Sequence, residues 1–229
     1  MLREIVFDTE TTGFHPEEGD KLVEIGAVEL LNHIPTGVQY HQYINPEREV
    51  PEDAFKVHGL SYDYLKDFPT FKDVAKEWLD FVGDAKLVAH NASFDMKFIN
   101  FELKGVGYDE LSWDRVVDTL EIARRLFPGS RVNLDALCRR FGVDNTSRTL
   151  HGALLDAQLL AEVYLELLGG QEPSMLGDEK KTQQFAATVD FSQIKKQFRE
   201  PRPFPLSEEE IKAHEEFLAN KINNALWLS

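Results

Sequence analysis

Cysteine and long apolar runs are the features that this 229-residue sequence most clearly lacks. The single cysteine, Cys138, cannot form a disulfide within the chain, and it fits a reducing compartment. No apolar run approaches the roughly 18 residues that a membrane-spanning helix needs. Residues 1–4 lead directly into a predicted strand and do not form a secretory signal. These absences predict a cytoplasmic protein without membrane contacts.

Positive charge is also scarce. The chain has 25 Lys and Arg residues against 40 Asp and Glu residues, which gives a formal net charge of -15 at pH 7. Most of such a surface repels the phosphate backbone of a nucleic acid. If the substrate is a nucleic acid, another component has to help to hold it.

The order of the predicted elements indicates an α/β domain in residues 1–170. Three strands come first, and their short connections predict an antiparallel meander. Two further strands then alternate with helices. The predicted strands run from residue 5 to the turn at Gly13 and over residues 21–30, 37–44, 85–90 and 115–120, and the last of them runs into a helix. Further predicted helices cover residues 71–82, 93–103, 133–141 and 153–168. Residues 46–70 are predicted to be rich in loops. The sequence therefore predicts a mixed five-stranded sheet flanked by helices.

Residues 171–229 differ in kind from this domain. Residues 171–206 are predicted to be a flexible linker, because the stretch begins with polar residues, glycine and proline. In residues 207–229, Ser207 and Glu210 form the capping-box pattern of a helix start. A capped, amphipathic segment after a polar linker is typical of a docking peptide. An ordinary disordered terminus is the alternative.

Two carboxylates lie at the end of the first predicted strand. Asp8 and Glu10 are two residues apart, and because side chains alternate along a strand, both point to the same face. Like charges so close repel each other unless a cation lies between them. Carboxylate oxygens suit a hard divalent ion such as Mg²⁺ or Mn²⁺. Both residues are therefore candidate metal ligands, with a strand end whose acids simply face water as the alternative.

Two further acids lie where helical periodicity favours apolar side chains. Asp156 shares its side of the predicted helix with Leu160 and Val163. A carboxylate at the edge of a core is costly unless it is paired or binds a metal. Asp95 lies among phenylalanines in the first turn of its helix. For Asp95, the alternative is an acid that the helix dipole favours.

His151 precedes Asp156 by five residues, a spacing that would turn the two side chains apart on one continuous helix. Gly152 instead suggests that His151 lies in the loop that enters the helix, where it can reach the same site. A lone histidine is more often structural than catalytic. Its position beside Asp156 makes His151 a candidate general base near neutral pH.

The candidate ligands together carry the charge of a two-metal site. Four carboxylates balance two divalent cations, and the four belong to Asp8, Glu10, Asp95 and Asp156. Such a site with a histidine nearby provides what the hydrolysis of a phosphodiester requires. One metal lowers the pKa of the attacking water, the other stabilises the leaving oxygen, and the histidine takes the proton.

Three motifs resemble those of the DEDD family of 3′–5′ exonucleases, in the order of that family. They cover residues 7–13, 90–95 and 151–157. The histidine five residues before the last aspartate is similar to the histidine branch of the family. The resemblance implies an RNase H-like fold, two bound Mg²⁺ or Mn²⁺ ions and one general base. The implied metal ligands are Asp8, Glu10, Asp95 and Asp156, and the implied base is His151.

The resemblance extends to weaker signals for substrate contacts. Residues 57–60 are similar to a loop that touches the terminal nucleotides in this family, and residues 11–13 match a turn whose backbone lies near the 3′-terminal sugar. The implied substrate-binding residues are Thr11, Thr12, Gly13, His58 and Asn91. Polar loop residues that only satisfy backbone groups are the alternative at these positions.

The tail resembles that of the proofreading exonucleases of bacterial replicative polymerases. Residues 169–176 are similar to a segment that binds the sliding clamp, although an extra residue lies between Gln171 and Ser174 and Gly177 replaces a common aromatic. Residues 206–227 are similar to the segment that binds the catalytic (alpha) subunit of the polymerase. The resemblance implies a proofreading exodeoxyribonuclease of the bacterial replisome, which releases nucleoside 5′-monophosphates from a DNA 3′ end. Tethering to these partners would offset the repulsion between the acidic chain and DNA.

Two alternatives stay open at this point. An RNA-trimming exoribonuclease of the same fold would carry the same motifs, but it would not need the tail. A catalytically idle tether between polymerase and clamp would need the tail, but not the four acids and His151. Hydrolysis of DNA and of RNA with Mg²⁺ separates the three interpretations.

Overall fold

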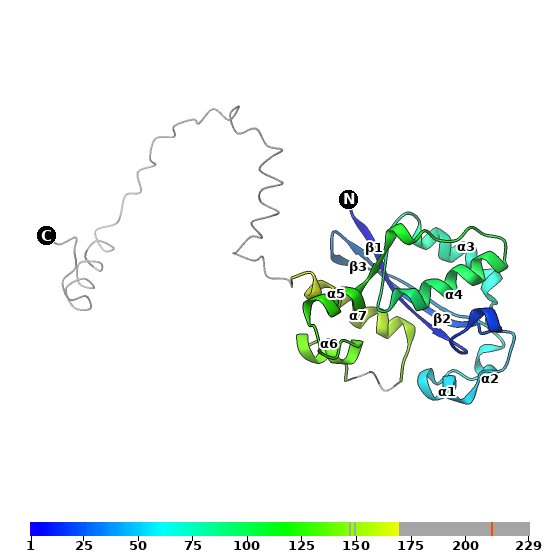
Figure 1. The fold of residues 1–229 in the computed structure, drawn as a ribbon. Helices are drawn as coiled ribbons and strands as arrows, with labels where there is room; N and C mark the ends of the chain where they lie inside the picture. The colour runs from blue at the N-terminus through cyan, green and yellow to red at the C-terminus, as the bar shows by residue number, and fades with distance from the viewer. Residues whose placement is uncertain (147, 149, 170–211, 213–229) are drawn as a thin grey trace, which may run out of the picture. The chain divides into compact units, whose positions relative to one another are not determined.

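The computed structural model describes residues 1–146, 148, 150–169 and 212. In this part of the chain, helices flank a five-stranded sheet of order β3-β2-β1-β4-β5 (Figure 1). The strands are β1 (Arg3–Thr11), β2 (Leu22–Leu31), β3 (Ile34–Tyr43), β4 (Lys86–Ala89) and β5 (Val116–Asp118). The predicted mixed five-stranded α/β fold is confirmed.

The first three strands form the predicted antiparallel meander, because β2 pairs antiparallel with both β1 and β3. β4 pairs parallel with β1, and β5 pairs parallel with β4. Parallel strands need long crossover connections, and the crossover from the meander to β4 contains α3 (Phe71–Val82), while that from β4 to β5 contains α4 (Ala92–Gly105). The carboxyl ends of β1, β4 and β5 therefore lie at the same edge of the sheet.

Side chains of β1 alternate between two apolar layers. Phe7 packs against Trp78 of α3, with ring centroids 5.8 Å apart. Val6 packs on the opposite face with Leu160 of α7 (Ala153–Leu167). Even-numbered positions of β1 thus face α7, whereas odd-numbered positions face α3 and α4. The helices α5 (Thr119–Leu126) and α6 (Leu134–Phe141) complete a third apolar cluster with α7.

Residues 46–70, predicted to be rich in loops, also contain two short helices. These are α1 (Glu52–His58) and α2 (Tyr62–Leu65). Gly59 ends α1 with a left-handed backbone (φ +74°), and the side chain of Ser61 caps α2. The prediction was incomplete here because helices of one or two turns are too short to show an apolar stripe and depend on tertiary packing.

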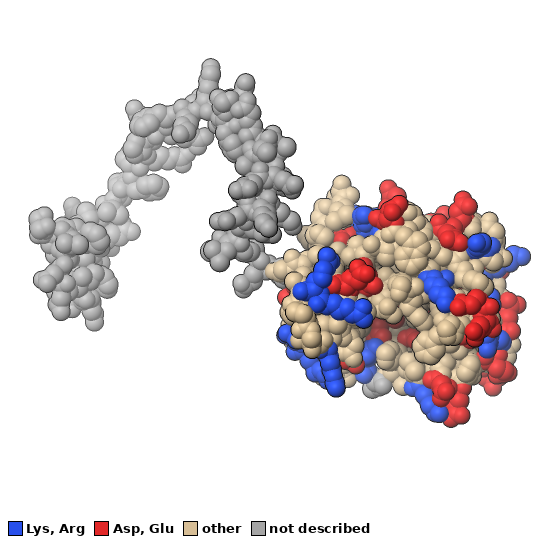
Figure 2. Space-filling model, viewed as in Figure 1, with Lys and Arg blue, Asp and Glu red and all other residues tan. Residues whose placement is uncertain are grey.

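The described part of the chain contains no helix that is long and apolar enough to cross a membrane. The predicted linker and docking segment, residues 171–206 and 207–229, lie outside the described residues except for Lys212. On the face drawn in Figure 2, Lys and Arg side chains lie among Asp and Glu side chains. That mixture agrees with a chain that carries no excess of positive charge.

Candidate active site

The first two acids lie near the carboxyl end of β1, the central strand of the sheet. Asp8 and Glu10 lie on β1 beyond Val6, the last residue of this strand that pairs with β4. As even-numbered positions they continue the face of Val6, which packs against α7. Both side chains line one pocket of about 800 Å³. The predicted alternation thus places both carboxylates in the same pocket.

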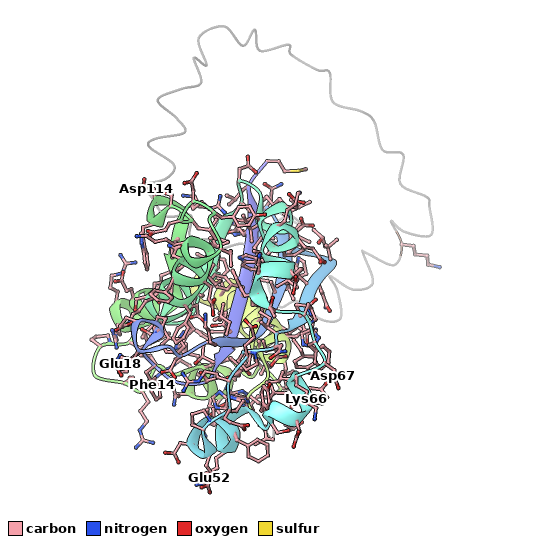
Figure 3. The ribbon with its side chains drawn as sticks, turned by 90° about the vertical axis from the view of Figure 1, so that its right-hand side faces the viewer. Phe14, Glu18, Glu52, Lys66, Asp67 and Asp114 are labelled. Carbon is pink, nitrogen blue, oxygen red and sulfur yellow. The ribbon has the colours of Figure 1, made fainter. Side chains whose placement is uncertain are left out.

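This pocket lies at one end of the described domain. Figure 3 shows Phe14, which follows β1, and Glu52, at the start of α1, near that end, and Asp114, which precedes β5, near the opposite end. Phe14 also lines the pocket. All ten residues that the sequence nominated line it as well: Asp8, Glu10, Thr11, Thr12, Gly13, His58, Asn91, Asp95, His151 and Asp156.

Asp156 lies in the first turn of α7 and lines the pocket, and only 3% of this residue is exposed. Two backbone contacts with β2 fix this turn. Glu24 Oε2 accepts a hydrogen bond of 3.2 Å from the backbone N–H of Ala153. Gly26 lies directly beneath the backbone of Ala153 and Leu154, so closely that a Cβ atom at this position would overlap it. The start of α7 is therefore held on the sheet through its backbone.

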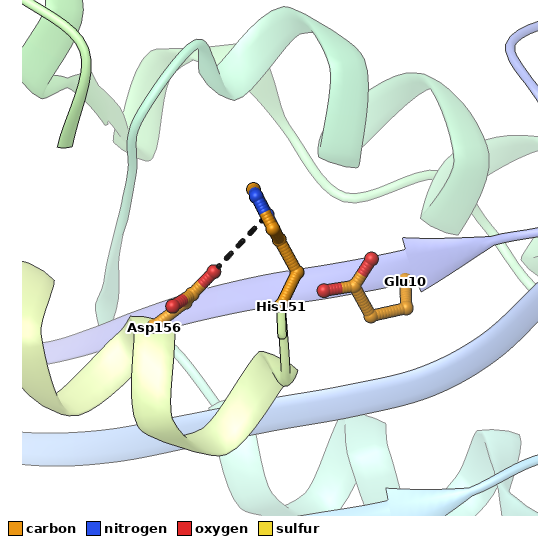
Figure 4. A group of neighbouring side chains, drawn as sticks. All are labelled: Glu10, His151 and Asp156. Carbon is orange, nitrogen blue, oxygen red and sulfur yellow. Dashed lines mark ion pairs between the residues drawn. The ribbon is translucent and has the colours of Figure 1, made fainter. Parts of the chain in front are cut away.

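His151 lies in the loop before α7, as predicted, and Gly152 is the N-cap of the helix. The backbone N–H of His151 donates to the carbonyl of Val57 in α1, at 3.1 Å. Its Nδ1 atom lies 3.5 Å from Asp156 Oδ2. Glu10, His151 and Asp156 each place a possible ligand atom within 4.8 Å of the other two (Figure 4). The loop before α7 and the strand β1 each therefore bring one side chain, His151 and Glu10, close to Asp156.

Asp95 reaches the pocket from the opposite layer of the fold. It lies in the first turn of α4 and is buried. Its Oδ1 atom accepts hydrogen bonds from the backbone N–H of Thr9 at 3.1 Å and from the Thr9 hydroxyl at 2.7 Å. Because Thr9 is an odd-numbered residue of β1, it faces α4 while its two acidic neighbours face α7. Strand β1 therefore positions three of the four acids, whereas β2 holds the helix turn that carries Asp156.

Burial raises the pKa values of three of these carboxyl groups. Burial, with the added charge of Glu24, raises the pKa of Glu10 from 4.5 to about 8. Burial raises the pKa of Asp95 to about 7, although the hydrogen bonds from Thr9 oppose the change. Burial and the charge of Asp95 raise the pKa of Asp8 well above its usual range. Without a cation, the cluster is therefore partly protonated at neutral pH.

The donor set fits a divalent metal ion. Glu10 Oε1 is buried and has no hydrogen-bond partner among the described residues, which is rare for a buried polar atom. Carboxylate oxygens are the ligands that Mg²⁺ and Mn²⁺ prefer. A cation here would satisfy the orphaned oxygen and neutralise the charges that raise the pKa values. The tightest group contains His151 beside Glu10 and Asp156, whereas Asp8 and Asp95 line the same pocket outside that group.

Sequence reasoning missed Arg148, which contacts three of the pocket residues. Its Nε and Nη2 atoms donate to the two carboxylate oxygens of Asp156 at 2.5 and 2.7 Å. Its Nη1 atom donates to Asp135 Oδ1 at 2.9 Å, and Nη2 lies 3.0 Å from His151 Nδ1. The only signal in the sequence is an arginine three residues before His151, and nothing in the spacing shows that it reaches Asp156 or Asp135.

Comparison with known proteins establishes the class of this fold and site. A family model described as Exonuclease (RNase_T) matches residues 5–164, more than two thirds of the chain. The solved nuclease domain of 3′hExo, a DEDDh family member bound to rAMP, has a TM-score of 0.63 to this chain. It is 19% identical, and the match covers 72% of this chain and 91% of that one. The predicted RNase H-like exonuclease fold is confirmed, and the matched family model places the chain among the exonucleases.

Relatives that match almost the whole chain identify the family within this class. DNA polymerase III subunit epsilon of Rickettsia felis is 46% identical, over 98% of this chain and 99% of the relative. The protein of the same name from Escherichia coli K12 is 44% identical, over 99% of this chain and 98% of the relative. The chain belongs to the DNA polymerase III epsilon-subunit family, within the exonuclease family.

Proposed function

We propose that the chain is the proofreading 3′–5′ exodeoxyribonuclease of a bacterial replicative polymerase. It hydrolyses the 3′-terminal phosphodiester bond of DNA and releases nucleoside 5′-monophosphates. The observation that carries this proposal is the convergence of Glu10, His151 and Asp156 within 4.8 Å, in a pocket that also contains Asp8 and Asp95. Membership of the epsilon-subunit family supports the same reaction.

Asp8, Glu10, Asp95 and Asp156 are the proposed ligands of two divalent ions, Mg²⁺ or Mn²⁺. When bound, the ions supply positive charge at the scissile phosphate and lower the pKa of the attacking water. The family supports dependence on a divalent metal, and the orphaned Oε1 atom of Glu10 supports coordination at that residue. The hydrogen bonds from Thr9 orient the carboxylate of Asp95 in advance, which reduces the reorganisation that metal binding requires.

His151 is the proposed general base. Burial and the neighbouring guanidinium of Arg148 lower the pKa of His151, so its imidazole is neutral at pH 7 and can accept a proton. The backbone hydrogen bond to Val57 ties the position of His151 to α1. Its side chain is 49% exposed, so a water molecule can reach the ring.

The substrate-binding residues lie around this centre. The Nδ1 atom of His58 accepts the backbone N–H of Leu60 at 3.0 Å, which assigns the proton to Nε2. The His58 ring is buried in the wall of the pocket beside the backbone of Thr11, and it is proposed to act at the terminal nucleotide. Thr11, Thr12, Gly13 and Asn91 line the same pocket and are proposed to bind the 3′-terminal sugar and its neighbour.

The acidic chain needs partners to hold DNA. We infer that residues 207–229 dock on the polymerase catalytic (alpha) subunit and that residues 171–206 include a weaker contact to the sliding clamp, in the cytoplasmic replisome. Tethering raises the effective concentration of the pocket at the primer end without attraction between the chain and DNA. A mispaired end frays more readily than a paired one, and a pocket that accepts single-stranded DNA therefore favours errors.

The proposed function is tested by 3′-end release from a 5′-labelled single-stranded DNA oligonucleotide, with Mg²⁺ or with a chelator. Wild type should release 5′-monophosphates only with the metal, and Asp8→Ala and His151→Ala should lose this activity. Asp114→Ala and His33→Gln remove the same residue types far from the pocket, and both should retain activity. A duplex with a mispaired 3′ end should be shortened faster than a paired duplex.

The outcomes separate the remaining interpretations. Brisk release from RNA with none from DNA would assign the chain to RNA trimming. Metal-independent release, or full activity of His151→Ala, would contradict the proposed roles. The absence of hydrolysis of either substrate would favour a polymerase–clamp tether.

A further inference from the structure

The guanidinium of Arg148 contacts His151 and Asp156, two of the three residues that could together hold a metal ion. Arg148 donates to both carboxylate oxygens of Asp156, in the two-point geometry that makes arginine–carboxylate pairs strong. The Arg148 side chain is only 8% exposed, and that of Asp156 is 4% exposed. The pair is therefore largely shielded from water, where such an interaction is stronger than at an exposed surface.

The same carboxylate oxygens cannot serve both cations fully. Glu10, His151 and Asp156 form the group that can hold a metal, and Asp156 contributes an oxygen to it. Both of its oxygens already accept hydrogen bonds from Arg148. A divalent ion and the guanidinium also repel each other across the short distance to a shared carboxylate. Metal binding to Asp156 and the present position of Arg148 therefore compete.

Asp135 offers the guanidinium a second partner outside the four acids. It lies in the first turn of α6 and accepts a hydrogen bond of 2.9 Å from Arg148 Nη1. Its side chain is 42% exposed, so it can retain an arginine at the edge of the pocket at little desolvation cost. Among the described residues that line the pocket, Arg148 is the one arginine or lysine. In the described lining of the pocket, this single basic side chain thus lies between two carboxylates, those of Asp135 and Asp156.

We propose that Arg148 is a positioning residue that serves as a built-in counter-ion of the metal site. It neutralises and orients Asp156 while no metal is bound, and it gives up Asp156 and stays with Asp135 when a metal ion binds. This inference rests on the proposed function, because it requires Asp156 to be a metal ligand. Its consequence is that Arg148 weakens metal affinity and stabilises the metal-free fold.

The test measures Mn²⁺ binding to the full-length protein by calorimetry, after treatment with a chelator and without DNA. Arg148→Gln should bind Mn²⁺ about tenfold or more tightly than wild type, because hydrogen bonds to a charged group are worth roughly one tenfold step or more. Arg148→Lys should give an intermediate affinity, because lysine keeps the charge but lacks the two-point geometry. The control is Arg48→Gln, since Arg48 pairs with Asp20 of the same pocket at 3.0 Å. A general effect of charge would tighten binding equally in both variants.

The variant Asp135→Asn tests whether Asp135 retains the guanidinium of Arg148 when Mn²⁺ binds. Removing this partner leaves the guanidinium with Asp156 alone, so Mn²⁺ binding should weaken several-fold. In the Arg148→Gln background, the same substitution should have little effect, because it acts through the arginine. An equal effect of Asp135→Asn in both backgrounds would refute this part of the mechanism.

Thermal unfolding with and without Mn²⁺ distinguishes the proposed role of Arg148 from a purely structural one. Without metal, Arg148→Gln should unfold at a lower temperature than wild type, because Asp156 loses its buried partner. Saturating Mn²⁺ should raise its Tm by more than it raises that of wild type. Equal or weaker Mn²⁺ binding by a folded Arg148→Gln protein would overturn the inference and leave the proposed function intact. An absence of Mn²⁺ binding by wild type and variant alike would overturn both.

Discussion

Gly26 provides the sharpest test of how the fold positions the site. It lies in the middle of β2, paired with Asp8 of β1, and its backbone needs no left-handed conformation. An added Cβ atom would lie well under 3.0 Å from backbone atoms of Ala153 and Leu154, a separation that real Cβ atoms essentially never show. A backbone cannot rotate away as a flexible side chain can. Gly26→Ala must therefore push the start of α7 off the sheet.

The size of the effect follows from this displacement. The start of α7 has to move by about 1.3 Å, because the Cβ atom would lie 2.1 Å from the backbone nitrogen of Leu154 and ordinary contact begins at 3.4 Å. Overpacking of this kind costs about 1–3 kcal/mol. In a chain of this size, that corresponds to a Tm lower by roughly 2–12 °C. Because Asp156 is one turn into the same helix, a shift of about 1 Å should also lower kcat by about 100-fold.

The assay combines calorimetric unfolding with single-stranded DNA hydrolysis under saturating Mg²⁺. Gly105→Ala is the matched control, because nothing lies within 4 Å of a Cβ atom there and its φ is not left-handed. That variant should keep its activity and should unfold at the wild-type temperature or slightly above it. A Gly26→Ala protein with wild-type Tm and wild-type kcat would refute the argument that the close approach of β2 and α7 sets the position of Asp156.

Three further predictions follow from the contacts of the described residues. In a chelator, Glu10 should lower the free energy of unfolding by up to about 1.4 kcal/mol per pH unit between pH 4.5 and about 8, because it holds a proton in the folded state after the unfolded chain has released it. The raised pKa values of Asp8 and Asp95 should add to this slope. Urea titrations should show this slope reduced in Glu10→Gln, and a wild-type stability that rises over this range would contradict it. Glu24→Ala should destabilise the protein by about 1–3 kcal/mol, because the buried N–H of Ala153 loses its acceptor, and Glu24→Gln, which keeps an acceptor oxygen, should lose less. Tyr164→Phe should cost about 1 kcal/mol, because it removes the 2.8 Å hydrogen bond to the buried Glu4, and unchanged kcat should accompany the lower Tm, since neither residue lines the pocket.

The sequence predicted those parts of the site that depend on local periodicity. The spacing of Asp8 and Glu10 fixes their common face in any strand, and the structure places both in the pocket. Gly152 before the helical run placed His151 in the entry loop, and the structure agrees. Asp156 interrupted an apolar stripe, and the structure places it in the pocket. Each of these inferences needs only the geometry of one element.

The contacts that sequence reasoning missed join elements that are far apart in the chain. Glu24 accepts a hydrogen bond from Ala153, which is 129 positions away. Arg148 is close in sequence to Asp156, but the hydrogen bond that links it to Asp135 depends on how α6 packs beside α7. Periodicity reports which face a residue occupies, but it does not report which residue of another element lies opposite. The framework of the site was therefore predictable, whereas its electrostatic balance was not.

This excess of acids over basic side chains in the pocket determines how the chain can act on DNA. Seven described residues that line the pocket are acids, against one arginine: Asp8, Glu10, Asp20, Asp53, Asp95, Asp135 and Asp156. The arginine is already engaged by two of them. A phosphodiester can therefore approach only after cations have neutralised the cluster, and the net charge of -15 adds repulsion at longer range. A pocket of this kind acts on a DNA end that is delivered to it, since it has little attraction for DNA that it meets by diffusion. Tethering to a partner that holds the primer, as proposed above, would supply the attraction for DNA that this acidity removes.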